Sequence, residues 1–305
     1  MIAARAIEPN RTRLTASPFY PVPRLHARDG PLSMNAQLGL FWASVGLYGL
    51  GFLFAAWRLA GARPYRFWPK LAILLPAFLL HTAFLWEHGL AQGRCPVATV
   101  FETLVFVAWC IVGLHLAFAI FIRLNSLTVF VMPLVLLAML AASAVGDRAS
   151  ARAGAHGVWL GAHAAVDELS FAAFALSGVA SLMYLVQESQ LRRRRLSASF
   201  MQLPPILRLQ SLATWLFVGG FVLYSLGLAG GAVAVIVRKT ELACADAKLV
   251  WAGGVWIYAF ILAAGRVRGR LSGRRFAWLC LGGVIFIFAT FALANAWSGF
   301  HRFGG

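Results

Sequence analysis

Charged residues are scarce in this chain, and their scarcity decides the class of protein. Asp, Glu, Lys and Arg make up 12% of the 305 residues, whereas a soluble globular protein has about 25%. Hydrophobic residues make up 61%, and the mean hydropathy is +0.77. Without charge to interrupt them, apolar runs reach about 20 residues, the length that crosses a bilayer as a helix. This composition excludes a soluble globular domain, and the alternating pattern of an outer-membrane barrel is not visible.

Acidic residues and paired cysteines are also rare. The chain has 10 Asp and Glu residues against 27 Lys and Arg residues, a formal net charge of +17. In a soluble protein this charge would suggest a nucleic-acid partner. In a membrane protein, however, basic residues collect in cytoplasmic loops. No nucleic-acid-binding motif accompanies the charge, so we expect no nucleic-acid partner. The four cysteines form no CxxC or CxxCH motif, which excludes a thioredoxin-like reductant and a c-type cytochrome.

Long apolar runs dominate the sequence after residue 33. Backbone groups in hydrocarbon must be hydrogen-bonded within the segment, so each run is expected to be a helix. The sequence therefore predicts an all-α integral membrane protein with about eight transmembrane helices. The runs cover roughly 37–57, 69–86, 101–122, 126–145, 159–186, 211–237, 249–264 and 276–297.

Basic residues between the runs predict the orientation in the membrane. The connections 58–70, 187–210 and 265–275 hold more Lys and Arg than those on the other side. By the positive-inside rule they are cytoplasmic, which makes both termini extracytoplasmic in a multi-pass protein of the cell inner membrane. Cys95 and Cys244 then lie outside, where disulfides persist. Two alternatives stay open: a disulfide between these two cysteines, or two unpaired thiols.

The first 33 residues differ from the rest of the chain. They are rich in Arg and Pro and contain no apolar run, so they are neither a signal peptide nor a spanning helix. We expect residues 1–33 to be a disordered or mis-started extension. Residues 34–305 are expected to form a single polytopic membrane domain.

Histidines near the helices are the candidates for function, because polar groups in a membrane are costly without a partner or a role. His163 and His301 are both expected at the outer surface. Neutral imidazole is an axial ligand of haem iron, so they are a candidate pair of iron ligands. Asp167, one helical turn after His163, is placed to orient its ring. His81 lies deep in the second run. For each histidine, hydrogen-bonded packing or a proton relay stays open.

Other polar and small residues have simpler explanations. For Asp167, Glu168 and Glu102, a structural position at the level of the lipid headgroups stays open. Gly227, Gly230 and Gly231 offer a small-residue face, which allows close contact between membrane helices.

Five segments carry a resemblance to a known family. Residues 94–109 hold a Pro, an aromatic-Glu pair and an apolar run with Trp, and the later segments hold two outer histidines, a Leu-Pro helix start and basic loops. In this order they resemble the cytochrome c assembly family, the CcsA, CcmC and HemX-like membrane proteins. The resemblance covers roughly residues 70–300. The segments are 94–109, 158–195, 203–233, 268–288 and 295–303.

The resemblance implies a haem-handling assembly factor rather than a classical enzyme. Such a protein holds or delivers haem at the outer face of the inner membrane during cytochrome c biogenesis. The family's two outer histidines, matched by His163 and His301, ligate a non-covalent haem b, and a Trp-rich loop lies over the porphyrin. Asp246 and Trp251 match part of that loop, and His81 matches an early-helix histidine of many relatives. The implied partners are the lipid bilayer, haem, and another cytochrome c assembly protein or apocytochrome c.

The segment 237–258 departs from the family's loop, because the tryptophans before Asp246 and the proline after it are absent. This departure favours the HemX-like branch and keeps two alternatives open. One is a membrane regulator or scaffold of tetrapyrrole synthesis that acts through the basic segment 187–210. The other is a small-molecule transporter that uses His81, Asp167 and Glu168 as its polar path.

Overall fold

Eight long α-helices make up the part of the chain that the computed structural model describes, which is residues 32–61, 67–121, 125–146, 158–194, 203–238 and 247–297. No strand occurs in these ranges. The helices are α1 (Met34–Ala60), α2 (Phe67–Gln92), α3 (Val100–Phe121), α4 (Thr128–Val145), α5 (Val158–Arg192), α6 (Ile206–Arg238), α7 (Ala247–Val267) and α8 (Gly273–Trp297), with a 3-10 turn η1 (Asn125–Leu127) before α4. All eight are long and apolar enough to span a membrane, which confirms the predicted all-α membrane fold.

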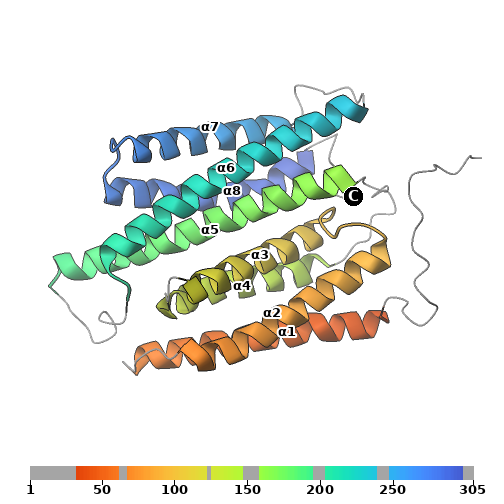
Figure 1. Ribbon diagram of the computed structural model, residues 1–305, viewed down its shortest axis with the longest axis horizontal. Helices are drawn as coiled ribbons and strands as arrows, with labels where there is room; N and C mark the ends of the chain where they lie inside the picture. Colours follow the sequence, from red (N-terminus) through yellow and green to blue (C-terminus); the bar gives the residue numbers. More distant parts are fainter. Residues whose placement is uncertain are drawn as a thin grey trace, which may run out of the picture. The chain divides into compact units, whose positions relative to one another are not determined.

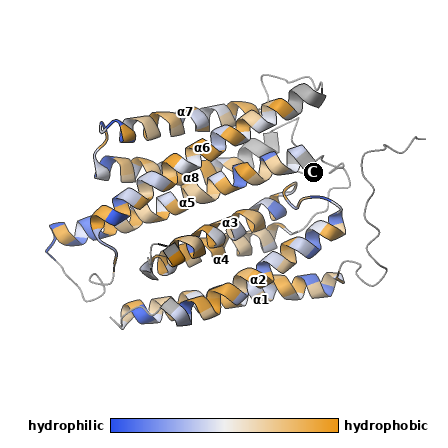
Figure 2. Ribbon diagram, in the orientation of Figure 1, coloured by the Kyte–Doolittle hydropathy of each residue, from blue (hydrophilic) through white to orange (hydrophobic). Residues whose placement is uncertain are grey.

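Hydrophobicity is distributed along these helices as a bilayer requires. The helical bodies are hydrophobic, and hydrophilic residues gather mainly towards their ends (Figure 2). Most helices are longer than the apolar runs that predict them. The longest helices are α5, which has 35 residues, and α6, which has 33. A helix rises about 1.5 Å per residue, so both exceed the roughly 30 Å of bilayer hydrocarbon.

The start of α1 is fixed by residues just before it. The Ser33 side chain accepts a hydrogen bond from the Ala36 backbone N–H, as a helix N-cap does. The Leu32 N–H donates to the Glu87 carboxylate at 2.9 Å. Leu32 and Ser33 therefore belong with the helices, while residues 1–31 of the expected extension lie outside the described residues.

Two groups of four helices are apparent in the packing (Figure 1). In the N-terminal group α1 packs on α2 and α4, and α3 on α4. In the C-terminal group α5 packs on α6 and α8, and α7 on both α6 and α8. The contact between α3 and α5 is the main junction between the groups. We call the end at which α1, α3, α5 and α7 finish the inner end, and the opposite end the outer end.

The largest helix interface joins α5 and α6, and glycines of α6 make it close. A Cβ atom on Gly220 would lie 3.0 Å from the Phe174 ring of α5. One on Gly227 would overlap the Asp167 carboxylate, and one on Gly231 would lie 2.9 Å from the His163 ring. The predicted small-residue face is therefore a real contact face, and large or polar side chains of α5 fill the space that its glycines leave.

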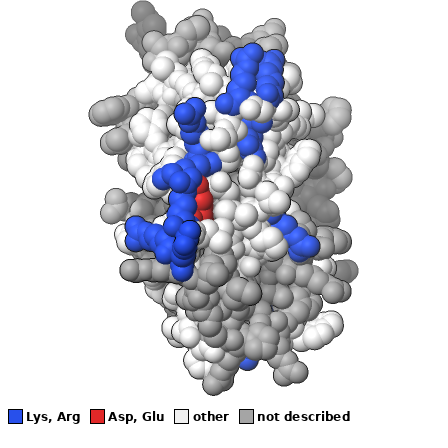
Figure 3. Space-filling view, turned by 90° about the vertical axis from the view of Figure 1, so that its left-hand side faces the viewer, with Lys and Arg blue, Asp and Glu red and all other residues white. Residues whose placement is uncertain are grey.

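Charge differs sharply between the two ends of the helices. The inner end carries a dense set of basic residues with Glu188 as the described acid, and Figure 3 shows several blue patches and one red patch on that face. The described acids of the outer end are Glu87, Glu102, Asp167 and Glu168. By the positive-inside rule this asymmetry favours a cytoplasmic inner end, as the sequence predicts. The inner-end arginines of the C-terminal group are Arg192, Arg193, Arg194, Arg208, Arg266, Arg268, Arg270, Arg274 and Arg275.

The glycine contact gives a matched test of α5–α6 packing. We expect Gly220→Ala to lower the thermal stability of the purified protein, because overpacking against Phe174 costs about 1–3 kcal/mol. The neighbouring Gly219 has open space at its Cβ position, so Gly219→Ala should leave the melting temperature unchanged or slightly raised. Equal melting temperatures for the two variants would contradict the close approach.

Candidate functional site

His163 is held in one orientation at the outer end of α5. Its Nδ1 atom lies 2.6 Å from the backbone oxygen of Gly227 on α6. A carbonyl oxygen only accepts, so Nδ1 carries the hydrogen and donates it. The basic nitrogen of the ring is then Nε2, the atom that a metal would use. The ring is therefore anchored through one nitrogen in the way that metal-binding histidines usually are.

Asp167 supports the same ring nitrogen from one helical turn further along. Its Oδ2 atom lies 3.3 Å from Nδ1 of His163, and both side chains are 17% exposed. A carboxylate beside Nδ1–H raises the electron density of the ring and so strengthens Nε2 as a ligand. The spacing of four residues predicts this pair, and the structure brings the two side chains together.

Two glycines of α6 provide the space for this pair. A Cβ atom at position 231 would lie 2.9 Å from Cε1 and 3.0 Å from Nε2 of His163. At position 230 it would lie 3.8 Å from His163 Cβ, which is ordinary van der Waals contact. The ring edge that carries Nε2 therefore lies against the bare backbone of Gly231.

An aromatic layer lies beside the His163–Asp167 pair, towards the membrane interior. Phe171, one turn after Asp167, contacts Tyr224 of α6 and Trp251 of α7, with ring centroids 5.6 and 6.2 Å away. Phe291 of α8 lies 5.7 Å from Trp251. The Trp251 indole donates to the Thr290 hydroxyl at 2.9 Å, which ties α7 to α8. All four helices of the C-terminal group thus contribute apolar surface beneath the histidine.

The structure brings together some of the predicted site residues. His163 and Trp251 lie in the same helix group. His81 belongs to the N-terminal group, where it is fully buried and its Nδ1 lies 3.2 Å from the Tyr48 hydroxyl of α1. His301 and Asp246 lie outside the described residues. The pairing of His163 with His301 therefore stays a prediction.

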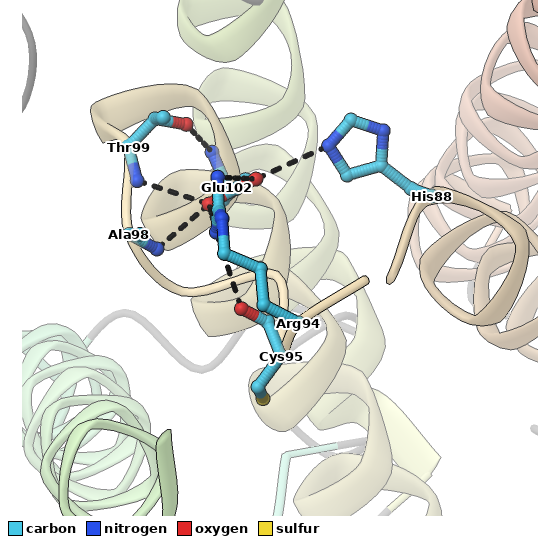
Figure 4. A network of polar contacts seen from close by, with 6 residues as sticks. All are labelled: His88, Arg94, Cys95, Ala98, Thr99 and Glu102. Atoms are coloured by element: carbon cyan, nitrogen blue, oxygen red, sulfur yellow. Dashed lines mark hydrogen bonds and ion pairs between the residues drawn. The ribbon is translucent and has the colours of Figure 1, made fainter. Parts of the chain in front are cut away.

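Glu102 is the centre of a polar network at the outer start of α3 (Figure 4). Its carboxylate accepts two hydrogen bonds from the Arg94 guanidinium, at 2.8 and 2.9 Å. It also accepts the backbone N–H groups of Ala98 and Thr99, and Nε2 of His88 lies 3.3 Å away. The Glu102 side chain is fully buried within the protein, at the outer start of α3. Removing one partner of such a buried ion pair typically costs about 3–5 kcal/mol.

The local signal for this network was present in the sequence. Thr99 caps the first turn of α3 by accepting the Glu102 N–H, while Glu102 accepts the Thr99 N–H in return. This reciprocal arrangement is the capping box that the pattern Thr-x-x-Glu encodes. The long-range partners His88 and Arg94 are set by tertiary packing and have no such signature.

Cys95 connects this network to the helix that carries His163. The Cβ atom of Cys95 would lie 3.1 Å from a Cβ atom on Gly161, two residues before His163. Cys95 is a free thiol. Cys244, its partner in the bridge considered from the sequence, lies outside the described residues. Burial raises the pKa of the Cys95 thiol, and the nearby Glu168 and Glu102 carboxylates raise it further.

A second buried polar group lies in the N-terminal helix group. Lys70, which belongs by sequence to the connection 58–70, lies in the first turn of α2, because this helix begins at Phe67. The residue is only 1% exposed. His115 of α3 is fully buried, and its Nε2 lies 3.0 Å from the Thr128 hydroxyl of α4. This hydrogen bond across two helices agrees with a packing role for His115.

The fold and these contacts define a polytopic helical membrane protein with an oriented histidine at its outer end. A family model described as cytochrome C assembly protein matches residues 97–301. The match covers more than half of the chain, so the chain belongs to the cytochrome c assembly family. It includes α3 to α8, and with them His163, Asp167, Glu102 and Trp251.

Individual relatives place the chain near two branches of this family. It is 33% identical over 144 residues to Protein HemX of Brevibacillus brevis and 26% identical over 235 residues to Protein HemX of Bacillus subtilis. It is 30% identical over 116 residues to the cytochrome c biogenesis protein CcsA of Gloeobacter violaceus. The three alignments cover 46%, 76% and 36% of this chain, respectively. The chain spans 53% of the first relative's length, 85% of the second and 34% of CcsA.

Cys95 provides a test of orientation and of its environment. In a Cys244→Ser background, we expect a membrane-impermeant maleimide to label Cys95 from the outer side of intact spheroplasts. Because the pKa of Cys95 is raised, its thiolate fraction at neutral pH is small, so labelling should be slow and should accelerate as pH rises.

The control is Ser272→Cys, in the connection between α7 and α8, combined with Cys95→Ser and Cys244→Ser. This variant should react only after permeabilisation. If Ser272→Cys were labelled in intact spheroplasts, and Cys95 in the other variant were not, the protein would have the opposite orientation in the membrane.

Proposed function

We propose that this protein binds haem and holds or delivers it at the outer face of the inner membrane during cytochrome c biogenesis. The observation that carries the proposal is the anchored His163 ring, whose Nδ1 donates to the Gly227 carbonyl, which leaves Nε2 as its basic nitrogen. Membership of the cytochrome c assembly family and similarity to a protein named for cytochrome c biogenesis support it.

The residues of the C-terminal helix group fit a haem ligand site. His163 supplies a neutral imidazole, and Asp167 together with the Gly227 carbonyl fixes its tautomer and orientation. Gly231 keeps side-chain atoms away from the Nε2 edge of the ring. The aromatic layer beneath the pair is apolar, as the faces of a porphyrin require. A non-covalent haem b would supply the iron centre and the porphyrin that an apocytochrome c takes up.

The remaining predicted residues complete this proposal. His301 is the proposed second axial ligand, and Asp246 with Trp251 is proposed to lie beside the porphyrin. His81, buried against Tyr48 in the other helix group, is a separate candidate for haem contact. The proposed partners are an apocytochrome c or another cytochrome c assembly protein at the outer face. The protein's own contribution is to bind, orient and protect haem rather than to act as a classical enzyme.

An absorbance spectrum tests the proposal directly. Protein purified in detergent from haem-replete cells is expected to show a b-type haem spectrum, because two imidazoles complete the iron's axial coordination. His163→Ala combined with His301→Ala should abolish it. His88→Gln, which changes an outer-end histidine of the other helix group, should retain it. A colourless wild-type preparation that gives no spectral change with added haemin would refute haem binding.

Substitutions at two glycines of α6 test whether the orientation of the His163 ring matters for haem binding while the histidine itself is kept. We expect Gly231→Ala to weaken haem binding about tenfold or more, because its methyl group displaces the Nε2 edge of His163 while the ligand itself remains. Gly230→Ala places its methyl group at an ordinary distance and should bind haem as the wild type does. Haemin titrations of both variants measure the difference, and equal affinities would show that the ring's position against Gly231 is unimportant.

A further inference from the structure

An apolar groove runs along α6 at the inner half of the molecule, outside the candidate haem site. It has a volume of about 640 Å³, and its walls come from α3, α5 and α6. The α6 wall is a single helix face, because its residues recur at helical spacing. This face includes Arg208, Leu212, Trp215, Gly219 and Leu223.

The groove opens towards lipid and has a polar inner mouth. Trp215 is 74% exposed and Leu207 is 72% exposed, so the α6 rim faces the surrounding hydrocarbon. Arg208, in the first turn of α6, lines the mouth together with Ser211. No described residue forms a hydrogen bond or ion pair with the Arg208 guanidinium. Its positive charge is thus available to an anion at the inner membrane surface.

The groove is long enough to hold a lipid tail. From Arg208 to Leu223 the helix rises about 22 Å, which exceeds the roughly 15 Å of hydrocarbon in one leaflet. Gly219 leaves open space at its Cβ position, so the groove continues past it without obstruction.

We propose that this groove binds an anionic phospholipid of the cytoplasmic leaflet, with one acyl chain along α6 and the headgroup phosphate against Arg208. A tail gains no hydrophobic free energy by leaving hydrocarbon for an apolar groove, so packing holds it and the headgroup decides which lipid binds. The surrounding inner end is strongly basic, and its described acid, Glu188, already pairs with Arg192. Charge complementarity therefore selects an anionic headgroup over a zwitterionic one.

Native mass spectrometry tests this proposal without reference to haem. The protein is released from nanodiscs that contain equal amounts of phosphatidylglycerol and phosphatidylcholine, and its bound lipids are counted. Wild-type protein is expected to retain phosphatidylglycerol about fivefold over phosphatidylcholine, the selectivity that one basic residue provides near a membrane surface. Arg208→Gln should bring this ratio close to one. Gly219→Leu, whose side chain fills open space, should remove the bound lipid.

Two matched variants show whether the effects belong to the groove. Arg193→Gln removes an exposed arginine of the same end outside the groove, and Gly253→Leu fills open space on α7. Both should retain lipid as the wild type does. Equal retention of the two lipids by wild type, or an equal effect of Arg193→Gln and Arg208→Gln, would overturn the proposal. The proposal would also be overturned if Gly219→Leu lost a bound second protein copy or a bound haem instead of a bound lipid.

Discussion

The close packing of α5 on α6 is the constraint on which the C-terminal half depends. In a bilayer, helices gain no hydrophobic free energy by associating, so contact depends on van der Waals fit and interhelical hydrogen bonds. Both occur in this interface. Glycines at 220, 227 and 231 admit the side chains of α5, and the Gly227 carbonyl accepts the His163 N–H. The same contact that holds the helices together therefore fixes the candidate ligand, and stability and function use the same few atoms.

The outer end of the N-terminal group is organised by a different kind of interaction. Glu102 gathers Arg94, His88 and two backbone N–H groups, so a buried carboxylate has its oxygens well satisfied. This network fixes the α2–α3 connection, and Cys95 in that connection packs on Gly161 of α5. The two helix groups thus meet at the outer end where Cys95 approaches Gly161, two residues before His163 in the chain.

Hydropathy predicted the helix count well, because the need to satisfy backbone groups in lipid leaves few alternatives for an apolar run. Helix periodicity also predicted the His163–Asp167 pair and the close-contact glycines. Periodicity could not show that the His163–Asp167 pair lies against these glycines, because the packing of α5 on α6 is set by tertiary structure. The network around Glu102 was not predicted for the same reason, because Arg94 is brought to it only in the folded connection. Lys70, which the sequence analysis counted with the connection 58–70, belongs to the first turn of α2, because this helix begins at Phe67.

The length of α5 has a consequence for the inner side of the protein. At about 1.5 Å per residue, 35 residues measure about 52 Å, longer than the roughly 40–45 Å of a whole bilayer with its headgroups. From His163 to Arg192 the helix rises about 44 Å, so with His163 near one surface the Arg192 end reaches the headgroup layer of the other. Arg192 and its neighbours Arg193 and Arg194 then lie at the level of the anionic headgroups, which attract basic side chains.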